Sequence, residues 1–160
     1  MREETSVGIG ELHVAGRDAV LSTFVGSCVA LCLYDPESKV GGMAHVLLPD
    51  SSKDTSAGTE AKYADRALEN TLRLMIEKGA APERLVAKIA GGAKIFSHEG
   101  SEDIFNIGTR NAEAIKSLLQ KKGIRVVGED VGMGSGRWVT FDTNSGKVKV
   151  TKRNTEDKIL

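Results

Sequence analysis

Four strand-like segments precede the first helix-like segment of this chain, and this order constrains the fold more than any other feature. Apolar and β-branched residues dominate the segments 11–15, 19–24, 29–34 and 40–48, and turn sequences such as Gly-Ser and Asp-Pro-Glu-Ser separate them. A doubly wound parallel fold alternates strands with helices from its start, so it is disfavoured. The order predicts an α+β domain with a mixed, largely antiparallel sheet.

Two helices are expected in the middle of the chain. Apolar residues recur at helical spacing over 62–78, and Gly79 follows as a natural stop. The second helix is expected over 110–122, with Thr109 as its N-cap and Gly123 as its end. Further strands are expected at 85–90, 124–127, 137–141 and 147–151.

Neither a repeat nor a linker divides the 160 residues, so one domain spanning 1–160 is expected, with a frayed tail over 152–160. Lys+Arg and Asp+Glu number 22 each and aromatic residues make up 4% of the chain, which argues against a nucleic-acid partner. No apolar run approaches the roughly 18 residues that span a membrane. The N-terminus also lacks the features of a secretory signal, so a cytoplasmic protein without membrane insertion is expected.

The chain contains two cysteines, Cys28 and Cys32. On one strand their Cα atoms would lie about 13 Å apart, beyond the roughly 7 Å that a disulfide tolerates. Two thiols without a CxxC motif make a poor zinc site, and the carboxylates are scattered. We therefore expect no metal site. Cys32, inside an apolar run, is expected to be core.

The hairpin around Asp-Pro-Glu-Ser relates Cys28 to a histidine. If these four residues form the loop, residues whose numbers add up to 73 pair across it, and Cys28 faces His45 directly. A thiol beside an imidazole is the minimum equipment for thiolate chemistry, and an imidazolium would lower the pKa of the thiol. Backbone N–H groups at the Gly26-Ser27-Cys28 corner could stabilise an oxyanion.

A purely structural role for Cys28 and His45 is the alternative. Free cysteine is among the most buried residue types, and a lone strand histidine is more often a hydrogen-bonded core residue than a base. His13 and His98 are expected at the surface. The glycine-rich segments IAGGAKIF and GMGSGRW lack the pattern of a nucleotide-binding P-loop and are interpreted as turns. NIGTRN could present helix N–H groups to an anion, or could simply cap the helix.

Several separated blocks, in one order, resemble the chemoreceptor glutamine deamidase family, CheD. These blocks are FVGSCVALCLYDP, GGMAHVLLP, KYAD, AKIAGGAKIF and FNIGTRN, and the resemblance runs from about Ser6 to Val150. It implies a protein-glutamine glutaminase that converts glutamine side chains of methyl-accepting chemotaxis receptors to glutamate. It also implies a layered α/β/β fold like that of deamidating toxins, a β-sandwich with two or three helices packed against it. The loop Ser97–Asp103 matches no block.

The resemblance assigns roles to individual residues. Cys28 is the nucleophile that forms a thioester, His45 is the general base, and Thr23 orients the histidine. The backbone at Gly26 and Ser27 would support the oxyanion, and no cofactor is needed. The resemblance further implies a complex with the CheC-type phosphatase of phosphorylated CheY. A mainly regulatory, CheC-binding protein is the alternative function, and another thiol hydrolase or a transglutaminase is a third.

Overall fold

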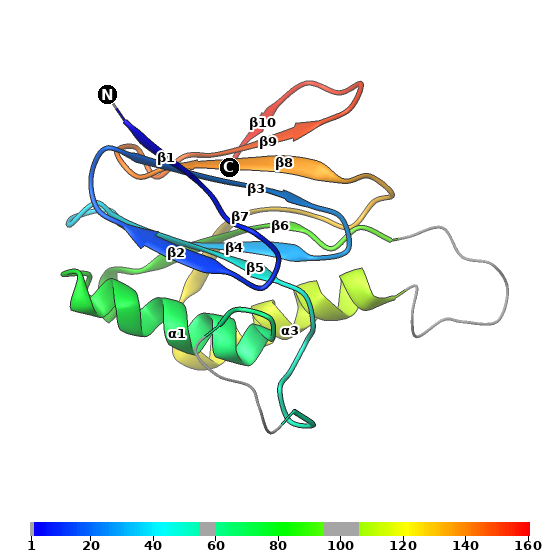
Figure 1. Ribbon diagram of the computed structural model, residues 1–160, viewed down its shortest axis with the longest axis horizontal. Coiled ribbons are helices and arrows are strands. Elements are labelled where there is room, and N and C mark those ends of the chain that lie inside the picture. Colours follow the sequence, from blue (N-terminus) through cyan, green and yellow to red (C-terminus); the bar gives the residue numbers. More distant parts are fainter. Residues whose placement is uncertain (1, 55–59, 95–105) are drawn as a thin grey trace, which may run out of the picture.

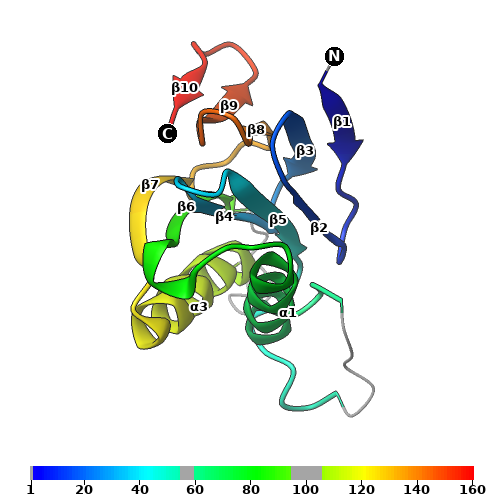
Figure 2. The ribbon, with the colours of Figure 1, turned by 90° about the vertical axis from the view of Figure 1, so that its left-hand side faces the viewer.

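The computed structural model describes residues 2–54, 60–94 and 106–160, which form three layers. Figure 2 shows an outer sheet, a middle sheet and a layer of helices stacked in that order. The outer sheet has the strand order β1 (Glu3–Ser6), β3 (Ala19–Val25), β8 (Arg137–Asp142), β9 (Val148–Lys152) and β10 (Lys158–Ile159). The middle sheet has the order β2 (Leu12–Ala15), β5 (Val40–Val46), β4 (Val29–Asp35), β6 (Val86–Gly91) and β7 (Arg125–Val131).

The strand pairing makes both sheets mixed and mostly antiparallel. Only β1 with β3 and β6 with β7 pair in parallel among the described strands. The helices α1 (Ala64–Glu77) and α3 (Ile107–Lys122) cover the free face of the middle sheet (Figure 1), and the short 3₁₀ helix η1 (Pro82–Arg84) leads into β6. The α+β class and the layered α/β/β arrangement are therefore confirmed. None of the described helices is both long enough and apolar enough to cross a membrane.

The central strands of the middle sheet are buried on both faces, because they lie between the outer sheet and the helices. All seven residues of β4 and all seven of β5 are buried. Val29, Leu31 and Leu33 point toward the helices, whereas Ala30, Cys32 and Tyr34 point toward the outer sheet. Each fully buried leucine contributes about 1.5–3 kcal/mol to stability. This two-sided burial explains the almost uninterrupted apolar run of β4.

The outer sheet has only one buried face, and β3 shows the corresponding alternation. Leu21, Thr23 and Val25 are buried against the middle sheet, while Phe24 is half exposed and packs edge-on against Trp138 with 5.1 Å between ring centroids. The period of two in a strand thus places the Thr23 hydroxyl between the two sheets.

The helices begin and end close to their expected positions, with one correction. Gly123 ends α3 in the left-handed conformation with φ 73°, as expected. The helix begins at Ile107, however, so Thr109 lies in its first turn and is not the N-cap. Gly108 lies against the backbone of Gly92 and Ala93, where a side chain would not fit, and this close packing accompanies the earlier start of the helix.

The C-terminal tail was expected to be frayed, but it contains a paired strand. Lys158 and Ile159 form β10, which pairs with β9 through Val150 and Lys149.

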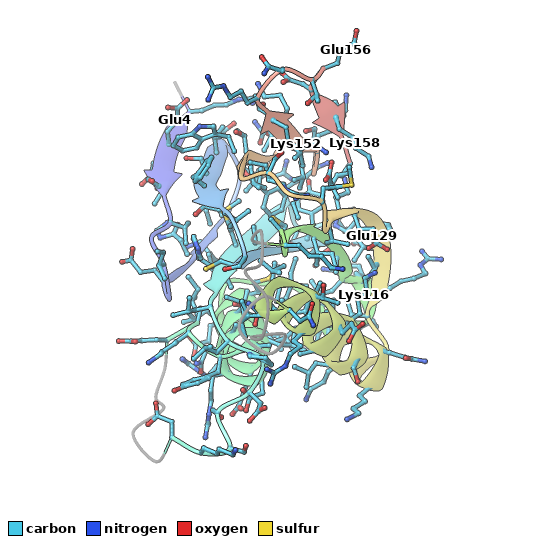
Figure 3. All side chains as sticks on the ribbon, turned by 90° about the vertical axis from the view of Figure 1, so that its right-hand side faces the viewer. Glu4, Lys116, Glu129, Lys152, Glu156 and Lys158 are labelled. Carbon is cyan, nitrogen blue, oxygen red and sulfur yellow. The ribbon has the colours of Figure 1, made fainter. Side chains whose placement is uncertain are left out.

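Figure 3 shows Lys116 of α3 beside Glu129 of β7, and their side chains form an ion pair of 2.6 Å at the surface. The Nζ of Lys158 donates to the Glu129 carbonyl at 3.2 Å, which links β10 to β7.

Candidate active site

The hairpin of β4 and β5 brings Cys28 and His45 to one face of the middle sheet. His45 pairs with Ala30, and Asp35 pairs with Val40, so paired residue numbers add up to 75 and not to 73. The predicted direct pairing of Cys28 with His45 is therefore wrong. Cys28, which directly precedes β4, lies diagonal to His45. Diagonal neighbours on one face have Cα atoms about 7–8 Å apart, a span that long or aromatic side chains reach.

The loop explains the shifted register. It has four residues, as predicted, but it consists of Pro36–Lys39, and Lys39 adopts a left-handed φ of 61°. Asp35 stays in the strand, where its carboxylate accepts hydrogen bonds from the backbone of Glu37 and Ser38. Moving a loop by one residue changes the pairing sum by two. An even change keeps every side chain on its predicted face.

Thr23, His45 and Val7 form a hydrogen-bonded chain between the two sheets. The Thr23 Oγ1 lies 2.6 Å from the Val7 carbonyl oxygen and 2.7 Å from Nδ1 of His45, and all of these groups are buried. A carbonyl only accepts, so the single hydroxyl proton of Thr23 is donated to Val7. Nδ1 of His45 must then carry its own proton and donate it to Thr23. The unprotonated nitrogen of neutral His45 is therefore Nε2.

The pKa of His45 is governed mainly by its burial. Burial lowers the pKa of the imidazole, while the Val7 carbonyl and the negative charge of Glu11 raise it in part. His45 is 2% exposed. The ring is thus neutral near pH 7, with its lone pair on Nε2. At Nδ1, the Thr23 hydroxyl accepts the ring proton, and the nearby Val7 carbonyl favours the charged form.

Cys28 is a neutral thiol, contrary to the expectation of a lowered pKa. Burial raises the pKa of Cys28, and the residue's own backbone N–H only partly offsets this. The predicted preformed ion pair with an imidazolium is not supported, because both groups are buried and each favours its neutral form. Cys32 is likewise a free thiol, and burial raises its pKa to about 12. It packs among apolar residues between the sheets, as expected.

Three consecutive carbonyl groups of the turn before β4 are held by hydrogen bonds. Gly26 accepts from the N–H of Ala93 at 2.9 Å and Cys28 accepts from the N–H of Gly92 at 2.8 Å. Ser27 accepts from Nδ2 of Asn111 at 3.1 Å. In a trans peptide the C=O and N–H groups point in opposite directions. Fixing the carbonyls of Gly26 and Ser27 therefore also fixes the N–H groups of Ser27 and Cys28.

Local sequence patterns did not identify several residues that shape this site. Val7 follows β1, Gly92 and Ala93 belong to the segment interpreted as a turn, and Asn111 lies within NIGTRN. Gly92, Ala93 and Asn111 lie in sequence blocks typical of the family, whereas Val7 lies in none of these blocks. Gly91 has φ 121°, and its backbone lies so close to the Cys28 carbonyl that a side chain would not fit there.

The remaining candidates do not join this site. His13 lies on β2 at the edge of the middle sheet, pairs with Met43 and is half-buried. His98 and the loop 97–103 lie outside the described residues. Within the described ranges, no group of three or more His, Cys, Asp or Glu side chains could hold a metal ion.

Comparisons with known proteins agree with the family suggested by the sequence blocks. The family model for CheD chemotactic sensory transduction matches residues 47–152. A protein of Archaeoglobus fulgidus named probable chemoreceptor glutamine deamidase CheD is 50% identical and covers 94% of both chains. Proteins of the same name are 43% identical in Thermococcus kodakarensis, over 93% of this chain and 92% of the relative, and 38% identical in Syntrophomonas wolfei, over the full length of both.

The solved structures contain a more distant match. A crystal structure of a Neisseria meningitidis protein is 18% identical and covers 78% of this chain and 52% of its own, with a TM-score of 0.42, too low to bear on the assignment. The family model and the full-length relatives are sufficient. The chain belongs to the CheD family.

Proposed function

We propose that this protein hydrolyses glutamine side chains of chemoreceptors to glutamate and ammonia, with Cys28 as the nucleophile. The substrate class is supported by the names of relatives that are 50%, 43% and 38% identical to it over most of its length. The chemistry is supported by the geometry between the sheets. The observation that carries the proposal is the hydrogen bond from Nδ1 of His45 to Thr23, which leaves Nε2 as the base on the face where Cys28 lies.

In the first step, the neutral thiol loses its proton to Nε2 of His45 as Sγ attacks the side-chain carbonyl carbon of glutamine. Proton transfer and attack occur together, because burial disfavours a resting thiolate and a resting imidazolium alike. The carbonyl oxygen becomes an oxyanion. The N–H groups of Ser27 and Cys28 would donate to it, their directions being set by the hydrogen bonds on the Gly26 and Ser27 carbonyls.

In the second step, the His45 imidazolium returns its proton to the amide nitrogen, the C–N bond breaks, and ammonia leaves. A thioester between Cys28 and the glutamyl side chain remains. His45, neutral again, takes a proton from water, whose oxygen attacks the thioester carbonyl. The C–S bond then breaks, the proton returns to Sγ, and glutamate is released. Thr23 and the Val7 carbonyl stabilise the transient imidazolium at Nδ1 in both steps.

The test uses cytoplasmic fragments of the chemoreceptors from the same organism. The wild-type protein should convert specific glutamines to glutamate, which mass spectrometry detects as a gain of about 1 Da at each site, with one ammonia released per conversion. Cys28→Ala should abolish conversion and keep the fold, whereas Cys32→Ala, its matched control on the same face, should retain it.

The regulatory alternative makes a different prediction in the same assay. If the protein acts mainly by binding a CheC-type phosphatase, as the family resemblance also implies, the wild type would leave the receptor glutamines unchanged and still bind the phosphatase. Conversion by Cys28→Ala at the wild-type rate would instead show that the thiol is packing material.

A further inference from the structure

Asn111 connects the segment that carries Cys28 to the segment that carries His45. It lies on α3, and its side chain is fully buried against the middle sheet. Its Nδ2 donates to the Ser27 carbonyl at 3.1 Å and to the Leu47 carbonyl at 2.9 Å. Ser27 immediately precedes Cys28, and Leu47 follows His45 by two residues. One side-chain amide therefore holds both segments at a fixed distance from the helix.

The orientation of this amide follows from its neighbours. Both groups at Nδ2 are backbone carbonyls, which only accept hydrogen bonds, so the nitrogen and not the oxygen must face them. The Oδ1 atom is buried and has no hydrogen-bond partner among the described residues. A buried acceptor without a partner lowers stability. The unpaired Oδ1 offsets part of the stability that the two hydrogen bonds at Nδ2 provide, so the clearest effect of the asparagine is to restrain the two carbonyls.

The Ser27 carbonyl and the Cys28 N–H belong to the same peptide unit. Because that unit is planar and trans, a carbonyl drawn toward α3 turns the Cys28 N–H away from the helix. Donation to the carbonyl also polarises the peptide and makes its N–H a stronger donor. The neighbouring units are held by the backbone N–H groups of Ala93 and Gly92, whereas the Ser27–Cys28 unit is held by a side chain.

The geometry points to Asn111 as a positioning residue that aims the Cys28 N–H at the oxyanion. The inference rests on the proposed function, because the oxyanion is the one formed when Cys28 attacks a carboxamide. Asn111 does not contact the substrate carbonyl in this scheme. It acts through the Ser27–Cys28 peptide, so its loss should impair steps that create an oxyanion and spare other reactions of the same thiol.

The test compares two reactions of Cys28 in the variants Asn111→Ala and Asn111→Asp. Deamidation of receptor fragments forms an oxyanion, and its kcat should fall about 10- to 100-fold with KM nearly unchanged. Alkylation by chloroacetamide displaces chloride at a saturated carbon and forms no oxyanion, so its rate should stay within about twofold of wild type. A peptide that carries an aldehyde in place of the glutamine carboxamide should bind less tightly by a factor similar to the loss in kcat.

Asn70 provides a matched control. It is a buried asparagine on α1 that donates to the Glu60 carbonyl at 3.0 Å, so Asn70→Ala removes a comparable group elsewhere. It should leave kcat, alkylation and aldehyde affinity at wild-type values. Asn111→Asp keeps the side-chain shape but places an oxygen against the two carbonyls, so it is the more disruptive change. If it fails to fold, Asn111→Ala alone provides the test, and thermal unfolding of each variant identifies that case.

Three outcomes separate the possibilities. A folded Asn111 variant with wild-type kcat would overturn the inference. So would a loss of alkylation equal to the loss of kcat, because Asn111 would then support the thiol and not the oxyanion. If the wild type converts no receptor glutamine, the proposed function fails, but weaker aldehyde binding with unchanged alkylation would still support the role of Asn111.

Discussion

Thr23 of the outer sheet and His45 of the middle sheet are joined by a hydrogen bond of 2.7 Å between Oγ1 and Nδ1. This bond crosses the interior of the sandwich, and the Val7 carbonyl, 2.6 Å from the same hydroxyl, fixes its direction. Because His45 must donate, the bond determines which ring nitrogen holds a lone pair. The packing of two sheets thus selects the tautomer that proton transfer from a thiol requires.

Replacing Thr23 by valine should separate this role from packing. Valine keeps the branched shape but cannot accept the Nδ1 proton, so kcat for receptor deamidation should fall about 10- to 100-fold. Stability should fall by about 1–3 kcal/mol, because two buried hydrogen bonds are lost. Thr23→Ser keeps the hydroxyl and should restore most of the activity. Urea unfolding and steady-state kinetics measure the two effects, and a fully active Thr23→Val would remove Thr23 from the mechanism.

The hairpin of β4 and β5 shows what local sequence patterns can and cannot predict. Loop length follows from the run Asp-Pro-Glu-Ser, and it correctly places Cys28 and His45 on one face. The predicted sum of paired residue numbers is too small by two, because Asp35 remains in the strand. There Nε and Nη2 of Arg84, 49 residues away, donate to its carboxylate at 2.9 and 2.7 Å. A contact with a distant residue decides where the loop begins, and no local pattern contains it.

Asn111 and the tail were missed for a similar physical reason. The role of Asn111 depends on how α3 packs across the ends of β4 and β5, and that packing involves three separate parts of the chain. β10 forms because the edge of β9 is available for pairing, although the tail itself has a polar, turn-like composition. The alternation of buried and exposed residues in β3 places Thr23 on a buried face, but only the family resemblance connects it to His45.

The two thiols should differ in reactivity when the native protein is treated with iodoacetamide. Cys28 should react, with a rate that rises with pH through a pKa above that of an ordinary thiol, because burial disfavours the thiolate. Cys32 is 2% exposed and its pKa is about 12, so it should react only after unfolding. Peptide mapping of the labelled sites against pH measures both. A Cys28 reaction rate that is already constant above pH 6 would mean that a thiolate is present at rest.

Asp35 should stabilise the fold without contributing to catalysis. Its carboxylate is fully buried and bound by Arg84, which lowers the pKa of Asp35 well below its ordinary range. A lowered pKa means that the stabilisation is complete above the unfolded-state pKa of about 3.9 and is lost as the pH falls below that value. Asp35→Asn should lower the free energy of unfolding by about 3 kcal/mol at pH 7. In acid, the free energy of unfolding of this variant should depend less on pH than that of the wild type.

The surface pair of Lys116 and Glu129 provides the comparison for Asp35. Glu129→Gln removes an ion pair whose two side chains are each 42% exposed, so it should cost at most about 1 kcal/mol. Urea unfolding between pH 3 and 7 measures both variants. Equal losses of stability would show that burial of the Asp35 pair has no special effect, and a large loss of kcat in folded Asp35→Asn would contradict its separation from the active site.

Cys28 and His45 should behave as one unit when both are replaced. Cys28→Ala removes the nucleophile, and His45→Ala removes the group that accepts and returns the proton, so each should reduce receptor deamidation to near background. Neither residue retains a function in this reaction without the other. The double variant should therefore be no slower than the slower single variant, whereas independent contributions would multiply. Ammonia release by all three variants, measured with proteins whose folding circular dichroism has verified, provides the comparison. Strictly multiplicative losses would mean that the two side chains act in separate steps, and the proton transfer between Sγ and Nε2 would have to be abandoned.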